Sequence, residues 1–224
     1  MPGRPEIVGP ESGPEPPFPY RMADAVIMEK QRGRNDLGVR TANLDIHKPP
    51  SAYLEAPCPP FDDIPSGIYF GYASVALPAS HPDKPPGAAP GDFTVYPMAM
   101  SIGYNPHYGN KERSAEVHFL HNFELDFYGS YMRVLILGFI REERKYDSTQ
   151  ELIDDIMFDI KVTKKSLSRT GWSPKQGQVV WHSKTDDGSP APRQPDEDEN
   201  YGNVDGKLDI SWLVEPLPPN WDKK

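Results

Sequence analysis

The placement of proline is the feature that most restricts how this chain can fold. Of its 27 prolines, all but two fall in four stretches, residues 1–20, 49–65, 78–97 and 190–219. Because proline lacks a backbone N–H and blocks helix interiors and central strands, regular structure must lie mainly between these stretches. The chain therefore predicts a folded unit that is interrupted by proline-rich loops.

This pattern divides the chain into a Pro/Gly-rich arm (residues 1–21), a folded unit (residues 22–172) and an acidic, turn-rich extension (residues 173–224). Its 18 glycines and 27 prolines make up one fifth of the 224 residues, below the roughly 25–30% that marks wholesale disorder. A fully disordered chain is thereby excluded. The extension contains an apolar run, residues 210–214, which we expect to dock back on the folded unit.

Net charge and cysteine content limit the partners and the compartment. The net charge of −9 and the pI of about 5.1 argue against nucleic acid or an anionic membrane as a partner. Cys58 is the single cysteine, and residues 134–140, a near-continuous apolar run, are too few to span a bilayer. The N-terminus lacks the apolar segment of a secretory signal. We expect a soluble, cytoplasmic monomer without membrane insertion.

Several segments have the β-branched and aromatic content of strands. They are residues 67–77, 93–104, 115–123 and 131–140, with residues 22–28 as a further candidate. Pro97, within one of them, predicts a bulge or an edge position. The segment 131–140 is apolar enough to be buried on both faces.

One helix follows the strands. Ser148 and Glu151 have the spacing of a capping box. Apolar residues then recur at helical spacing on one face, namely Leu152, Ile153, Ile156, Met157 and Ile160. Several strands followed by one helix predict a small closed or nearly closed β-barrel with the helix packed against it.

Two groups of residues are candidates for chemistry. On a strand, Glu116 and His118 point to one face, and a carboxylate inside a small barrel would be desolvated and able to accept a proton. The same spacing also suits an ordinary solvated face. Thr41 and Asn43 offer hydroxyl and amide oxygens of the kind that bind Mg²⁺. They equally suit a turn in which both side chains bond their own backbone.

A set of ordered motifs connects these candidates. The motifs are Leu37-Gly38, Thr41-Ala42-Asn43, Gly67–Gly71, Ser101–Pro106, Glu116-Val117-His118, Asp126–Gly129, Leu137–Arg141 and Asp147-Ser148. Over about residues 22–165 they resemble the riboflavin kinases, ATP:riboflavin 5′-phosphotransferases, in their eukaryotic, fungal, single-function form. The resemblance implies a mainly all-β fold, a six-stranded antiparallel Greek-key β-barrel with a C-terminal α-helix packed on it.

The resemblance also implies roles for the candidate residues. Thr41 and Asn43 match the residues that hold Mg²⁺, with Zn²⁺ as an alternative ion, against the phosphates of ATP. Glu116 matches the catalytic carboxylate that takes the proton from the riboflavin 5′-hydroxyl as it attacks the γ-phosphate. The substrates are then ATP and riboflavin, and the products ADP and FMN.

Further positions match the parts of the family that shape the flavin end of the site. They are Phe127, Tyr128, Gly129 and Arg141. Aromatic and apolar walls suit an isoalloxazine ring.

The nucleotide loop departs from the family pattern. Members usually carry a Gly-rich loop, G-F-G-R-G-S-K, whereas residues 29–35 keep only one arginine and Gly33 of it. We expect Gly33, Arg34 and Thr41 to contact the nucleotide. Two hypotheses remain open. One is an active riboflavin kinase with an atypical loop, and the other a flavin-binding or interaction protein on the same barrel with weakened or lost ATP use.

Overall fold

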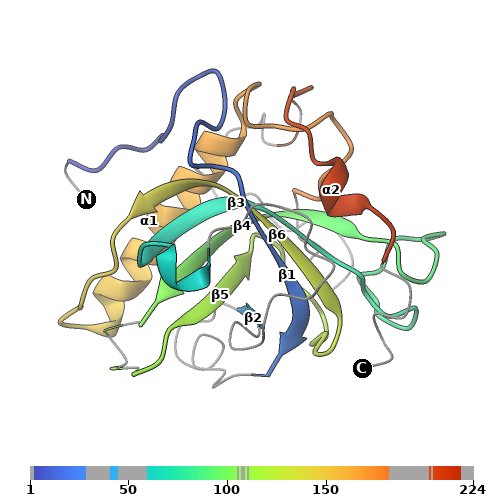
Figure 1. Cartoon of the computed structure of the whole chain (residues 1–224), viewed down its shortest axis with the longest axis horizontal. Coiled ribbons are helices and arrows are strands. Elements are labelled where there is room, and N and C mark those ends of the chain that lie inside the picture. Colours follow the sequence, from blue (N-terminus) through green and yellow to red (C-terminus); the bar gives the residue numbers. More distant parts are fainter. Residues whose placement is uncertain are drawn as a thin grey trace.

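A computed structural model describes residues 3–28, 41–44, 60–104, 106, 109, 111–181, 202 and 204–217. The strands are β1 (Tyr20–Ile27), β2 (Ala42–Leu44), β3 (Gly67–Val75), β4 (Thr94–Gly103), β5 (Ser114–Phe119) and β6 (Tyr131–Arg141). The helices are a 3-10 turn (Phe61–Asp63), α1 (Thr149–Leu167) and α2 (Ser211–Val214). Figure 1 shows these elements in their spatial arrangement.

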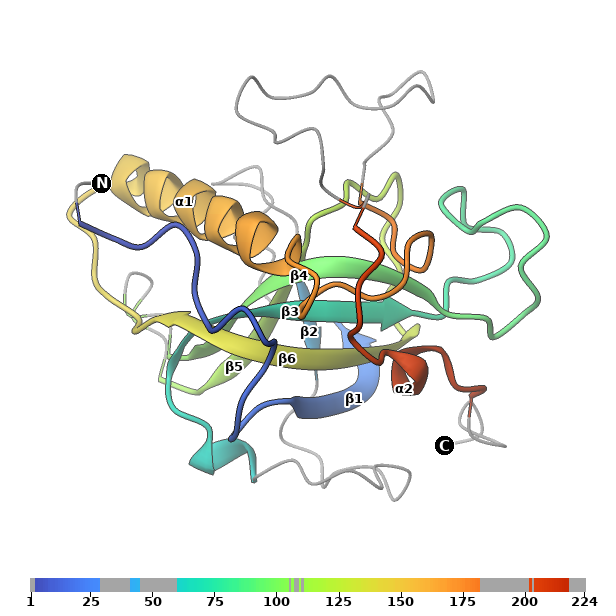
Figure 2. The same cartoon turned by 90° about the horizontal axis from the view of Figure 1, so that it is seen from above.

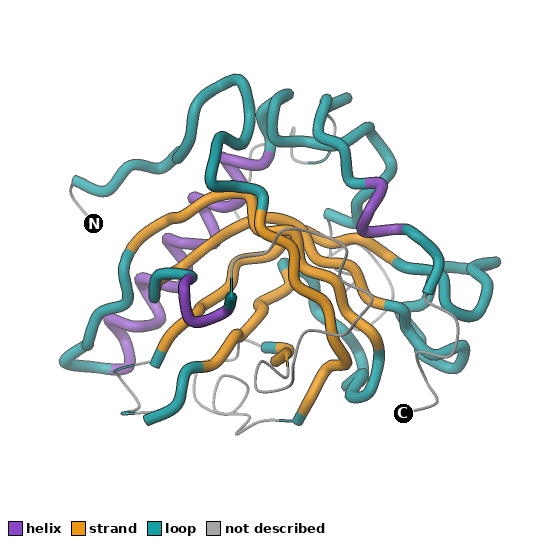
Figure 3. The backbone as a smooth tube through the Cα atoms, viewed as in Figure 1, coloured by secondary structure: helices purple, strands orange, loops and turns teal. Residues whose placement is uncertain are grey.

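The six strands form a closed barrel in the order β1-β2-β5-β4-β3-β6. All neighbouring pairs are antiparallel. Strands β3, β4 and β5 follow one another, and β6 returns to lie beside β3, which is the Greek-key arrangement. The predicted barrel is confirmed, and Figure 3 shows its strands as one curved wall.

Two apolar cores pack on the two faces of the barrel wall. Alternate residues such as Tyr69, Met98 and Val117 fill the barrel interior. Their neighbours on β3, β4 and β6 form a second core, on the outer face, with α1 and the C-terminal segment. Figure 2 shows α1 lying across that outer face. Strand β6 is buried on both faces from Tyr131 to Gly138, as its composition predicts.

The observed strands differ from the predicted ones by one or two residues at most ends, and the largest differences are at β5 and β2. Strand β5 ends at Phe119, four residues before the predicted end, and the three-residue β2 was not predicted as a strand because it is too short to show a pattern. Pro97 lies just beyond the last β4–β5 pair, Met98 with Phe119, and its carbonyl accepts from the N–H of Leu120 at 2.9 Å. On its other side Pro97 pairs with Tyr72 of β3 in regular register, so neither the bulge nor the edge strand predicted for it is present in this closed barrel.

The start of α1 agrees with the sequence, but its buried face does so only in part. The Ser148 hydroxyl accepts a hydrogen bond from the N–H of Glu151 at 3.2 Å, as the capping motif predicts. The buried residues are Leu152, Asp155, Asp159, Val162, Thr163, Ser166 and Leu167, while Met157 is 49% exposed. Of the expected apolar stripe, Leu152 is buried and Ile153, Ile156 and Ile160 are half-buried, so the stripe forms only part of the buried face. The helix also turns Asp155 and Asp159 inward, where arginine side chains bind them. No helix among the described residues is long and apolar enough to cross a membrane.

The N-terminal arm lies along α1 and the end of that helix (Figure 2). The indole N–H of Trp172 donates to the carbonyl of Pro10 at 2.6 Å. A Cβ on Gly13 would lie 2.5 Å from the carbonyl oxygen of Gly171, so the two backbones are in close contact. The arm and the helix thus form one packed unit.

The C-terminal segment also packs on the barrel. Ile210 and Leu213 are buried in the outer core. The Ser74 hydroxyl on β3 donates to the carbonyl of Leu213 at 2.7 Å. The expectation that residues 210–214 dock back on the folded unit is confirmed.

Candidate active site

Asn43 and Glu116 are directly opposite one another in the antiparallel pair of β2 and β5. Directly opposite residues point to the same face of a sheet. Asn43 is only 7% exposed, and in the part of the chain that the structure describes its Oδ1 is buried without a hydrogen-bond partner. Since a buried polar atom normally has a partner, this oxygen fits a ligand for a bound cation.

Glu116 lies on the outer face of the barrel. Its neighbours Ala115 and Val117 are in the interior core, so the side chain of Glu116 points the other way and is partly exposed. The Ser114 hydroxyl donates to Glu116 Oε1 at 3.0 Å. The expectation of a carboxylate inside the barrel is therefore wrong, because the register of β5 turns the odd-numbered residues inward. Glu116 lies on the same face as Asn43, its partner in the β2–β5 pair.

The pairing continues from this pair across the barrel wall. Asn43 pairs with Glu116, Glu116 with Ser101, Ser101 with Ile68, and Ile68 with Arg141. These five residues form one row on the outer face, which we call the outer row. With neighbouring strands about 4.8 Å apart, Glu116 and Arg141 are separated by at most about 14 Å along it. The structure thereby places Arg141 on the same face as Asn43 and Glu116.

Glu143 closes this face beside Ser101. Its Oε1 accepts from the Ser101 hydroxyl at 3.3 Å, and its Oε2 accepts from the N–H of Tyr104 at 3.0 Å. A Cβ on Gly103, whose φ is +153°, would lie 2.1 Å from Glu143 Oε2. Gly103 is thus required for the approach of this carboxylate, a role that the strand pattern alone did not reveal.

Thr41 lies at the entrance to a small aromatic cavity of about 30 Å³. The cavity is lined by Val26, Thr41, Ala42, Phe119, His121, Phe123, Leu125, Asp126, Phe127 and Tyr128. The Phe127 ring lies 4.5 Å from that of Phe123 and 5.8 Å from that of Phe119, centroid to centroid. A cavity of this volume is about the size of one water molecule, so it marks an aromatic patch against which a planar ring can pack and does not enclose one. The structure therefore joins Thr41, expected at the metal, to Phe127 and Tyr128, expected at the flavin.

A tight turn holds these aromatic residues against β1. The N–H of Ser130 donates to the carbonyl of Phe127 at 3.1 Å, and the N–H of Gly129 donates to the carbonyl of Val26 at 2.8 Å. Gly129 is the third of the four turn residues and has φ +80°. A positive φ at this position favours glycine. The position of Tyr128 is thus set by the backbone.

Arg141 is far from that turn. Phe127, Tyr128 and Gly129 precede β6, whereas Arg141 is the last of its 11 residues, about 30 Å farther along the strand at the usual rise per residue. A single flavin ring cannot contact both ends. The structure does not bring these expected flavin residues together. Gly33 and Arg34 lie outside the described residues.

The Arg141 guanidinium is held by α1. Its Nε and Nη2 donate to Asp159 Oδ2 at 3.0 and 2.7 Å. Burial of the guanidinium opposes its charge, but the hydrogen bonds to Asp159 outweigh this and raise the pKa of Arg141 above its ordinary value. Arg141 therefore presents a fixed positive charge at the end of the outer row.

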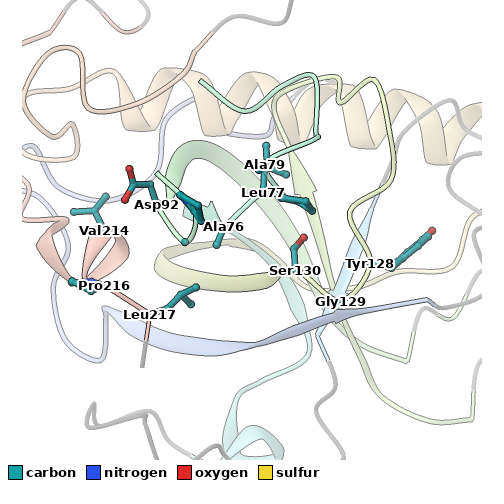
Figure 4. A pocket seen from close by; sticks show the side chains of 13 residues that line it. Ala76, Leu77, Ala79, Asp92, Tyr128, Gly129, Ser130, Val214, Pro216 and Leu217 are labelled. Carbon is teal, nitrogen blue, oxygen red and sulfur yellow. The ribbon is translucent and has the colours of Figure 1, made fainter. Parts of the chain in front are cut away.

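A wider cavity of about 770 Å³ lies on the other side of Tyr128 (Figure 4). It is bounded by residues 76–79, 90–92, 128–130 and 214–217. It contains none of Thr41, Asn43 and Glu116. Sequence reasoning did not predict this cavity because its walls come from segments far apart in the chain.

The donor set of the candidate metal residues favours Mg²⁺. Thr41 and Asn43 offer neutral oxygens, the ligand type of Mg²⁺, whereas Zn²⁺ is bound mainly by cysteine and histidine. Within the described ranges, no three His, Cys, Asp or Glu residues are arranged to hold a metal ion.

The sequence is similar to that of known proteins over most of its length. The family model described as Flavokinase, riboflavin kinase, matches residues 16–167. The chain is 47% identical to the riboflavin kinase of Pyricularia oryzae, over 95% of each chain. It is 43% identical to that of Chaetomium globosum, over 96% of this chain and 94% of the relative. The crystal structure of riboflavin kinase from Trypanosoma brucei is similar with a TM-score of 0.45 and 26% identity, over 67% of this chain and 81% of that one. The chain therefore belongs to the riboflavin kinase family.

Proposed function

We propose that this protein transfers the γ-phosphate of ATP to the 5′-hydroxyl of riboflavin, forming FMN and ADP. The observation that carries the proposal is the pairing of Asn43 with Glu116 on one barrel face. An unsatisfied metal-type oxygen and a carboxylate side by side are what a phosphoryl transfer to an alcohol needs. Relatives that match nearly the whole chain are named riboflavin kinases, which supports the same substrates.

Thr41 and Asn43 would hold Mg²⁺ in this protein. The buried Oδ1 of Asn43, which has no hydrogen-bond partner among the described residues, is the observation that supports this role. When bound, Mg²⁺ neutralises the charge of the phosphate oxygens. Thr41 and Asn43 themselves contribute by fixing where those phosphates lie relative to Glu116.

We infer a donor side and an acceptor side from this geometry. Thr41 lines the aromatic cavity of Tyr128, so we place the nucleotide base on that side. Arg141 ends the outer row on the other side of Glu116, so we place the flavin there. In-line transfer requires the leaving and attacking oxygens on opposite sides of the transferred phosphoryl group, which this division provides. Phe127, Tyr128 and Gly129, expected at the flavin, are thereby assigned to the nucleotide.

Glu116 acts as the general base. Its carboxylate accepts the proton of the riboflavin 5′-hydroxyl while that oxygen forms its bond to the γ-phosphorus and the bond to the ADP oxygen breaks. The Ser114 hydroxyl donates to Glu116 Oε1 and thereby helps to orient the carboxylate. A partly exposed position on the outer face allows the alcohol to reach it.

The test is FMN formation by the purified protein with Mg-ATP and riboflavin, followed by chromatography. The wild type is expected to form FMN, and Glu116→Gln to lose about 10²–10⁴-fold in kcat, the usual contribution of a general base. Glu112→Gln, an exposed carboxylate just before β5, is the control and should retain activity. Folded wild-type protein that binds riboflavin but forms no FMN would favour the alternative of a flavin-binding protein. The monomeric state and cytoplasmic location remain predictions from the sequence.

A further inference from the structure

Two buried aspartates of α1 lie where the N-terminal arm, the helix and the end of β6 meet. The side chains of Asp155 and Asp159 are 1% and 4% exposed. Asp155 accepts from Tyr146 at 2.8 Å and pairs with Arg144 Nε at 2.7 Å. Asp159 accepts from Arg141, the residue that ends the outer row. Buried carboxylates of this kind are stable only when they are paired and hydrogen-bonded.

Arg4, on the arm, bridges the two aspartates. Its Nη1 donates to Asp155 Oδ1 at 2.8 Å, and its Nη2 donates to Asp159 Oδ1. Arg141 donates to both oxygens of the same carboxylate, from Nη2 to Asp159 Oδ2 at 2.7 Å and from Nε to Oδ1 at 3.1 Å. Arg4 and Arg141 therefore hold Asp159 from two sides and fix its orientation.

The charge count shows why Arg4 matters for Arg141. With Arg4 present, three guanidinium groups face two carboxylates, so the cluster carries one surplus positive charge. Without Arg4, Arg141 and Arg144 alone must neutralise both aspartates. Arg141 Nη2 already lies 3.8 Å from Asp155 Oδ2, so loss of Arg4 would draw it toward the helix and away from the outer row.

The arm has other attachments that do not involve this cluster. Glu6 pairs with Lys161 at 2.9 Å and with Lys165 at 2.5 Å. The N–H of Val8 donates to the Ser166 hydroxyl at 3.0 Å. The arm can therefore stay on α1 when Arg4 is replaced, and Glu6 provides a matched control for the arm.

We propose that Arg4 is a positioning residue for the acceptor side of the site, acting through Asp159 on Arg141. The N-terminal arm then contributes to riboflavin binding and does not only pack against the helix. This inference rests on the proposed function, because it takes Arg141 as a contact of riboflavin.

The test compares full-length wild type, Arg4→Met, Arg4→Lys and Glu6→Gln. Arg4→Met is expected to raise the KM for riboflavin about tenfold while the KM for ATP changes less than about twofold. Arg4→Lys, which keeps the charge but not the two-pronged contact, should fall between Arg4→Met and wild type. Glu6→Gln should leave both KM values unchanged.

Binding of riboflavin is measured in parallel by quenching of flavin fluorescence, which needs no turnover. A weaker affinity in Arg4→Met but not in Glu6→Gln supports the positioning role even if the wild type forms no FMN, a result that would count against the proposed function alone. Equal changes in both KM values, or a loss of thermal stability with no change in riboflavin affinity, would overturn the inference and leave Arg4 a structural contact.

Discussion

The amide of Asn43 faces the carboxylate of Glu116 across the β2–β5 pair, on the outer face of the barrel. A buried amide oxygen without a partner among the described residues is unfavourable in itself, and a nearby carboxylate adds a second acceptor. A cation bound to Asn43 Oδ1 would satisfy this oxygen. We therefore expect Asn43 to lower the stability of the protein while it supports activity, and both effects can be measured.

Replacing Asn43 should separate stability from activity. In Asn43→Leu the unsatisfied oxygen is removed, so we expect the free energy of unfolding in the absence of Mg²⁺ to stay equal or rise by about 1 kcal/mol. FMN formation should be lost. Urea denaturation with a chromatographic assay checks both, and a strongly destabilised variant would contradict the role given to Asn43 Oδ1.

Tyr128 distinguishes the donor side from the acceptor side. If a nucleotide base stacks on Tyr128, which lines the aromatic cavity, Tyr128→Ala should raise the KM for ATP about tenfold. Base–aromatic stacking contributes about 1–3 kcal/mol. The KM for riboflavin should change little. Tyr104→Ala, an exposed tyrosine at the far end of β4, is the control for the ATP effect. A rise in the KM for riboflavin instead would restore the flavin role that the sequence suggested.

The inward aspartates of α1 should carry much of the stability of the helix contact. Asp159→Asn removes the buried anion that Arg4 and Arg141 share and leaves both to pair with Asp155, and breaking a buried ion pair costs about 3–5 kcal/mol. Asp154→Asn, whose exposed carboxylate accepts from Gln150, should cost less than about 0.5 kcal/mol. Similar losses in the two variants, measured by urea denaturation, would show that the aspartate cluster is not special.

The attachment of the arm should depend on acid pH. Hydrogen bonds from Lys165 and Lys161 lower the pKa of Glu6 from 4.5 to about 2. Because the pKa of Glu6 is lower in the folded state, its carboxylate stabilises the folded protein at pH values above 4.5. This contribution is lost as the pH falls from 4.5 toward 2. We therefore expect the unfolding free energy of wild type to fall more steeply in this range than that of Glu6→Gln. Parallel curves would show that the Glu6 pairs do not contribute.

Local patterns in the sequence were enough to predict the main elements. The β-branched and aromatic content of the chain marked β3, β4 and β6, and Ser148 with Glu151 marked the start of α1. Patterns of this kind report local backbone geometry, which depends on neighbouring residues. They could not predict β2, since three residues show no period, nor the buried face of α1, since Asp155 and Asp159 are inward only because arginines from the arm and β6 meet them.

By itself, the sequence determined the strand and helix composition, the ordered motifs of the family and the residue types suited to phosphoryl transfer. Only the tertiary structure decided that Glu116 faces outward beside Asn43 and that Thr41 shares a cavity with Tyr128. It also decided that Arg141 lies on the same barrel face as Glu116, at the end of the outer row. The physical reason is that strand register is a property of the closed barrel. Shifting one strand by a single residue exchanges its two faces, and no local pattern reports which strand is its neighbour. Composition set the proline-rich arm apart from the folded unit, but Arg4 on the arm binds Asp155 and Asp159 on α1. This contact could not be predicted from the sequence, because charges far apart in the chain are brought together only by folding.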